Sequence, residues 1–178
     1  MSQSTTFYRI SKDKFSELDT SGGHSFEPSL AKNYITLEGS FMALEFILSK
    51  NQDDSTIEQV KELFNPGQSI GEQNFNLDDL ESFEEFDIDN MGSSISYLDA
   101  GAIAGIHTIL NRLSTEEIEI LYDSEELNSN RIYPEVWHDD NSPDQGFNLR
   151  QVSEDFSELK AMIKQAKEEG DYVVVYGG

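Results

Sequence analysis

Two short segments of the sequence carry residue types and spacings that resemble metal-binding sites. The segment DIDNMG places Asp87, Asp89 and Gly92 at positions one, three and six of a calcium-binding loop. Position five is then Met91 and position twelve is Leu98, where such a loop needs an oxygen ligand and a bidentate glutamate. Because two required donors are missing, the spacing does not predict a calcium site.

The second segment, WHDD, offers His138, Asp139 and Asp140 as ligands. Three adjacent side chains seldom converge on one ion, so this pattern is more typical of a solvated loop. The chain has no cysteine, which excludes disulfides, thiolate metal sites and a thiol nucleophile. We therefore expect no metal and no cofactor.

Two ionisable side chains on predicted helices are candidates for acid–base chemistry. His107 follows Ile106 on a helix, where it is either a histidine at the helix flank or a general base. Glu45 lies within FMALEFIL, and a carboxylate on an apolar helix has a raised pKa if it is buried. The helical wheel places Glu45 near Met42 and Ser49, which favours an exposed position.

The segment RIYPEVW contains two aromatic residues, Tyr133 and Trp137, on either side of Pro134. They are interpreted first as core packing beside a turn and second as a shelf for an aromatic ligand. A pocket near Glu45, His107, Tyr133 and Trp137 is thus the arrangement that would support small-molecule binding or catalysis. The sequence contains no Gly-rich phosphate loop in a strand–helix context and no Gly-x-Ser-x-Gly motif.

Charge constrains the class of partner more strongly than any motif. The chain has 35 acidic and 12 basic residues, for a formal net charge of −23. Such a chain repels nucleic acids and anionic membrane surfaces, because both carry dense negative charge. It attracts basic proteins, and it does so fastest at low salt. The alternative interpretation is that the charge serves only solubility.

The acidic residues are densest in NLDDLESFEEFDIDN, residues 76–90, which contains no lysine or arginine. Large apolar side chains alternate with the acids. One interpretation is an insertion whose apolar edge packs on the domain while its acids face water. The other is a partner surface, since protein interfaces combine buried aromatic anchors with a charged rim. The residues of that predicted surface are Asp78, Asp79, Glu81, Phe83, Glu84, Glu85, Phe86, Asp87 and Asp89.

Length and periodicity predict the fold class. A chain of 178 residues with 37% hydrophobic residues fits one domain with a substantial core. We expect strands at 5–10, 93–98 and 172–176, and helices at 37–50, 99–113 and about 153–169. The expected caps are Ser11, Thr36, Asp99, the Ser114–Glu117 capping box and Gly170. The prediction is a single compact α+β domain, with both terminal strands in a small sheet packed by several helices.

Residues 65–92 are expected to form an acidic insertion within the single domain spanning 1–178. The first residues, MSQSTTFYRI, do not resemble a secretory signal, and no apolar run approaches the ~20 residues of a membrane helix. These features favour a cytoplasmic location.

Three segments resemble the YfbM-like family of bacterial proteins of unknown function. They are SISYLDAGAIAGIHTIL, LSTEEIEILYDSEELNSNRIYPEVW and EEGDYVVVYGG, and the resemblance is strongest over residues 95–176. It implies a compact α+β domain and brings no accepted activity. In the first long helix, the family's tryptophan and histidine correspond to Phe41 and Glu45 here, so chemistry that requires that histidine is not expected.

Together these features lead to two functional hypotheses. The first is a non-enzymatic cytoplasmic interaction protein, in its most specific form an immunity protein that neutralises a basic toxin through an acidic surface. The second is a small-molecule-binding or enzymatic domain that uses the pocket near Glu45. The two predict different features, because an inhibitor requires an acidic surface with apolar anchors and an enzyme requires a pocket with converging polar groups.

Overall fold

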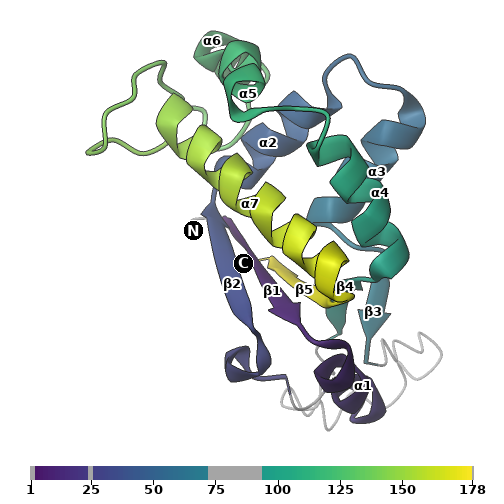
Figure 1. Ribbon diagram of the computed structural model, residues 1–178. Coiled ribbons are helices and arrows are strands. Elements are labelled where there is room, and N and C mark those ends of the chain that lie inside the picture. Colours follow the sequence, from purple (N-terminus) through teal and green to yellow (C-terminus); the bar gives the residue numbers. More distant parts are fainter. Residues whose placement is uncertain (1–2, 24–25, 72–93, 178) are drawn as a thin grey trace, which may run out of the picture.

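A five-stranded antiparallel sheet forms the centre of the molecule (Figure 1). The computed structural model describes residues 3–23, 26–71 and 94–177. The strand order is β2-β1-β5-β4-β3, and every neighbouring pair is antiparallel. The strands are β1 (Ser4–Ile10), β2 (Asn33–Glu38), β3 (Gln68–Ile70), β4 (Ile95–Leu98) and β5 (Tyr172–Gly177).

Helices cover both faces of this sheet. They are α1 (Lys12–Thr20), the short 3₁₀ helix η1 (Pro28–Leu30), α2 (Ser40–Ser49), α3 (Asp54–Phe64), α4 (Ala100–Leu110), α5 (Thr115–Leu121), α6 (Ser124–Ser129) and α7 (Leu149–Glu169). Figure 1 shows α7 crossing the sheet, with α4 and α3 beside it and α5 and α6 beyond its N-terminal half. The predicted α+β class is therefore confirmed.

The two terminal strands pair with each other, as the sequence predicted. β1 and β5 are antiparallel neighbours, with Phe7 opposite Val175. Along β5 the side chains alternate between the two faces of the sheet. Val173 and Val175 point into the core beneath the large helical layer, and Val174 points into the smaller core on the other face. A strand that is buried on both faces reads as a continuous apolar run, which explains the sequence YVVVY.

The smaller core, on the face covered by α1, is rich in aromatic rings. Phe15 of α1 stacks on Tyr172 with a ring-centroid distance of 3.8 Å, and it also contacts Tyr97 of β4. Phe26 packs against Tyr8 and Tyr176. Together with α1, these rings cover the central strands on this face of the sheet.

A compact charge network joins the end of β1 to the start of β5. Asp171 is only 2% exposed, and its carboxylate lies 3.0 Å from Arg9 Nη1 and 2.8 Å from Lys32 Nζ. Glu169 contacts the same two cations, and Arg9 Nε donates to Asn33 Oδ1. Two cations therefore face two carboxylates. This pairing is needed because a buried carboxylate without a cation would strongly destabilise the folded state.

One element differs from the sequence-based expectation. Thr36 does not cap a helix, because residues 33–38 form strand β2 and the helix begins only at Ser40. Leu37 is buried as part of the strand's alternation, so the apparent helical spacing spanned two elements. Gly39 makes the change of direction with φ of +75°, and a Cβ there would lie 2.8 Å from the Phe147 ring.

The other expected caps agree with the structure, although α7 begins four residues earlier than expected, at Leu149, and α4 ends at Leu110. The side chains of Ser11 and Asp99 cap α1 and α4, the Ser114–Glu117 capping box opens α5, and Gly170 ends α7 in the left-handed conformation. Within the expected insertion, residues 68–70 form β3 and pair with β4, while residues 72–93 lie outside the described residues. Among the described helices, none combines the length and apolarity needed to cross a membrane.

The packed face of α4 provides a test of the core. Ile106 and Leu110 are buried in the core formed by the helical layer and the sheet. Leu110→Ala should lower the free energy of unfolding by about 2–5 kcal/mol, because it removes buried methyl groups and leaves a cavity. Ile120→Ala on exposed α5 is the control and should change stability by less than about 0.5 kcal/mol. Urea denaturation measures both, and equal effects would contradict this packing.

Candidate functional site

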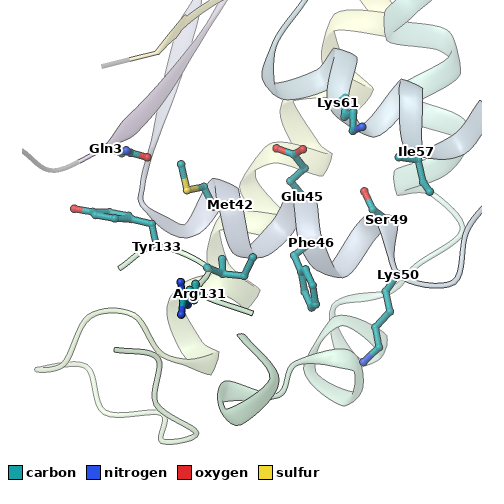
Figure 2. Close-up of a pocket in the computed structure, with 11 residues that line it drawn as sticks. Gln3, Met42, Glu45, Phe46, Ser49, Lys50, Ile57, Lys61, Arg131 and Tyr133 are labelled. Atoms are coloured by element: carbon teal, nitrogen blue, oxygen red, sulfur yellow. The ribbon is translucent and has the colours of Figure 1, made fainter. Parts of the chain in front are cut away.

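A groove of about 570 Å³ lies beside α2 (Figure 2). Its walls come from α2, from α3, from the segment after α6 and from the residue before β1. The lining residues are Gln3, Met42, Glu45, Phe46, Ser49, Lys50, Ile57, Lys61, Arg131, Ile132 and Tyr133. This volume falls within the range of small-molecule sites, which is roughly 300–1,000 Å³.

The wall formed by residues 131–133 is held in place by Trp137. The indole of Trp137 is buried, and its Nε1–H donates to the Ile132 carbonyl at 2.9 Å. Asn128 accepts the Trp137 backbone N–H through Oδ1 and donates to the Trp137 carbonyl. Trp137 also packs against Tyr122 and Phe147. It is therefore a structural residue behind the groove wall and does not line the groove.

Glu45 is the acidic residue of the groove lining. Its side chain is half-buried, whereas the sequence favoured an exposed position. Burial raises the pKa of Glu45, and the positive charge of Lys61 acts in the opposite direction. Figure 2 shows the Glu45 carboxylate and the Lys61 side chain on the same side of α2. The groove thus combines a partly desolvated carboxylate with cations around it.

The structure brings together two of the four residues expected to form a pocket. Glu45 and Tyr133 line the groove, and Trp137 lies behind its wall. His107 lies elsewhere, on α4, where its Nδ1 is 3.1 Å from Lys167 Nζ of α7. Burial lowers the pKa of His107, and the nearby Lys167 charge lowers it further. His107 therefore does not contribute to the groove.

The carboxylates of the WHDD segment are used in local structure. Asp139 accepts the backbone N–H of Ser124, the first residue of α6. Asp140 accepts from the Asn148 side chain and from the Ser142 backbone. In the described part of the chain, no group of three or more His, Asp or Glu side chains is arranged to hold a metal.

A second feature is an acidic surface on α5, α6 and the loop that leads to α7. Residues 113–149 contain ten acids and a single basic residue, Arg131. Glu117 and Asp123 cap helices, but other acids of this surface project freely into solvent. Ile120 is 81% exposed and Val136 is 51% exposed, although large apolar side chains are usually buried. The acidic surface consists of Glu116, Glu117, Glu119, Ile120, Asp123, Glu125, Glu135, Val136, Asp139, Asp140 and Asp144.

The sequence predicted a surface of this composition in another segment. The predicted partner-binding residues of the 76–90 segment lie outside the described residues, so that prediction stays a prediction. The surface on α5 and α6 was missed, although its signal was present as a long run with one basic residue. The groove had no such signal, because its lining residues come from separate segments.

The start of α2, the helix that carries four of the eleven groove residues, is fixed by a hydrogen bond to α7. The Ser40 hydroxyl donates to Asp155 Oδ2, and Ser40 is fully buried. Burial raises the pKa of Asp155 to about 6, and the Ser40 hydrogen bond limits that rise. The neighbouring Glu158 and Glu154 raise it further. This contact therefore orients the helix that presents Glu45 and Phe46.

Residues 1–176 match the family model described as DUF1877, a domain of unknown function. The chain belongs to this family. No curated protein sequence matches it. Among solved structures, the crystal structure of YfbM from Escherichia coli, a protein of unknown function, is similar with a TM-score of 0.60. The two chains are 14% identical and the match covers 100% of each, so the likeness shows that they share a fold. The predicted YfbM-like family is thus confirmed.

The Asp155 carboxyl should make stability depend on pH in a defined direction. Its pKa is about 6 in the folded protein and about 3.9 in an unfolded chain, so the folded state holds an extra proton between these values. Its contribution to stability is therefore lost as pH rises from about 4 to about 6. Asp155→Asn should be more stable than the wild type at neutral pH, by at most about 3 kcal/mol.

Urea denaturation of both proteins from acidic to neutral pH measures this difference. The advantage of Asp155→Asn should grow from about pH 4 to about pH 6 and then level off. Glu168→Gln is the control, because Glu168 is exposed on the same helix. A constant difference between Asp155→Asn and wild type, or a less stable variant at neutral pH, would contradict the raised pKa.

Proposed function

We propose that this protein is a non-enzymatic cytoplasmic binding protein that uses its acidic surface to engage a basic protein. In its most specific form, it is an immunity protein that neutralises a basic toxin. The observation that supports the proposal is the exposure of Ile120, at 81%, on a short helix with acids on either side of it.

The arrangement on α5 resembles the composition of a protein interface. Glu116 lies one helical turn before Ile120, and Glu119 precedes it directly, so acids surround an exposed apolar side chain. Interfaces combine apolar anchors at their centre with a charged rim. Val136 adds a second exposed apolar residue among acids, beside Glu135.

The charge of the surface favours a basic partner. Acids that face solvent raise the encounter rate with a cationic protein, and the effect decreases as salt screens it. The local hydrogen bonds support this role, because Glu117 in the capping box of α5 and Asp123 at the N-cap of α6 stabilise the first turns of these helices. A surface that is ordered before binding loses less conformational entropy on association.

The groove supports the alternative function, a small-molecule-binding domain. Its lining residues are different from those of the acidic surface. Glu45 and Tyr133 of the expected pocket both line it. The groove runs along α2, which contributes Met42, Glu45 and Phe46 to its lining (Figure 2).

The decisive experiment uses basic proteins encoded beside the gene for this protein. Each is tested for growth inhibition alone and for rescue on co-expression, and binding is measured by stopped-flow kinetics at low and physiological salt. The paired substitutions Glu116→Lys and Glu119→Lys should slow association by tenfold or more at low salt, because rim charges steer encounter. Ile120→Ala should instead speed dissociation, at a cost of roughly 2 kcal/mol if Ile120 is an anchor.

Matched controls separate a local effect from a change in net charge. Glu58→Lys and Glu168→Lys change the charge equally at exposed positions on α3 and α7 and should slow association less. The pair Glu84→Lys and Glu85→Lys tests the 76–90 segment in the same way. The proposal would be contradicted if neither pair of substitutions, at Glu116 and Glu119 or at Glu84 and Glu85, reduced rescue. Binding that does not depend on salt would contradict it as well.

A further inference from the structure

The groove beside α2 has an apolar floor. Met42 and Phe46 come from α2, Ile57 comes from α3 and Ile132 comes from the segment after α6. Phe46 and Ile132 also pack against the main core, so part of this floor is fixed by the packing beneath it. A floor of this kind suits the apolar body of a small ligand.

Two basic side chains of the groove have no charged or hydrogen-bonding partner among the described residues. Most of the twelve Lys and Arg side chains are engaged by a carboxylate or another polar partner: Arg9, Lys14, Lys32, Lys50, Arg150, Lys160, Lys164 and Lys167. By contrast, the side chains of Lys12, Lys61, Arg112 and Arg131 make no ion pair or hydrogen bond with the described residues, and two of these four, Lys61 and Arg131, line the groove.

The local balance of charge in the groove is therefore positive. Lys50 is neutralised by its contact with Glu126, which leaves Lys61 and Arg131 with Glu45 as the one acid of the lining. The many acids elsewhere repel an approaching anion, but exposed charges are screened beyond ~8 Å at physiological ionic strength. The charged groups of the groove lining therefore have the largest effect on whether an anionic or a cationic ligand binds there.

We propose that this groove binds a small organic anion with an apolar body. The anionic group pairs with Lys61 or Arg131, and the body lies on Met42, Phe46, Ile57 and Ile132. Figure 2 shows Lys61 and Arg131 on different sides of α2, so a ligand lying along the floor meets a cation near either end. The half-buried Glu45 disfavours a second negative charge beside it and so limits the ligands accepted.

The test uses three probes that share one chain length and differ in charge: octanesulfonate, octanol and octylammonium. Calorimetric titration of the full chain should detect octanesulfonate binding at millimolar or lower concentration, with octanol weaker and octylammonium weakest. The double variant Lys61→Met and Arg131→Met should weaken octanesulfonate binding roughly tenfold or more, because it removes the charged hydrogen bonds to the sulfonate. Glu45→Gln should strengthen it several-fold by removing the repelling carboxylate.

Lys12→Met is the matched control, because Lys12 is an exposed cation on α1, on the other side of the sheet. It should leave octanesulfonate binding unchanged, and thermal melting should show that every variant folds. Absence of octanesulfonate binding in the millimolar range, equal binding of octylammonium, or unchanged affinity in the double variant would overturn the proposal. The acidic surface uses other residues, so its own test is independent of this result.

Discussion

Burial of β5 at the centre of the sheet is the constraint on which the other elements depend. The C-terminal strand pairs with the N-terminal strand on one side and with β4 on the other. Its three consecutive valines are buried, two beneath the helical layer and one beneath α1. As the middle strand, it must satisfy backbone hydrogen bonds along both edges and apolar contacts on both faces. The fold is therefore complete only when the two ends of the chain have met.

The charge network at Asp171 reinforces this meeting point. It lies where α7 ends and β5 begins, and its cations come from β1 and from the residue just before β2. A buried ion pair of this kind adds little net stability over apolar packing, but leaving one partner alone in the core is costly. It therefore selects the arrangement in which β1, β2 and β5 are correctly placed.

The two candidate sites lie near the N-terminal half of α7, away from the Asp171 network at its C-terminal end (Figure 1). The Ser40–Asp155 hydrogen bond fixes the start of α2, and Trp137 fixes the segment after α6. Between them they set two walls of a groove in which Lys61 and Arg131 make no ion pair with the described residues, whereas Lys50 is paired with Glu126. The neighbouring surface of α5 and α6 has the opposite character, with acids around exposed Ile120. Two surfaces of opposite charge thus lie on one scaffold.

The sequence by itself determined the features that depend on near neighbours along the chain. Ser11, Asp99 and the Ser114–Glu117 box cap helices because a side chain reaches a backbone N–H two or three residues away. The terminal strands, the charge and the family could likewise be read from local pattern. The tertiary structure alone decided the rest. Residues 33–38 became a strand because β1 was available to pair with them. Helix packing brought the charge of Lys61 close enough to Glu45 to limit the rise of its pKa that burial causes, and placed Lys167 against His107. Such interactions join residues that are far apart in sequence, so the spacing of residues along the chain cannot predict them.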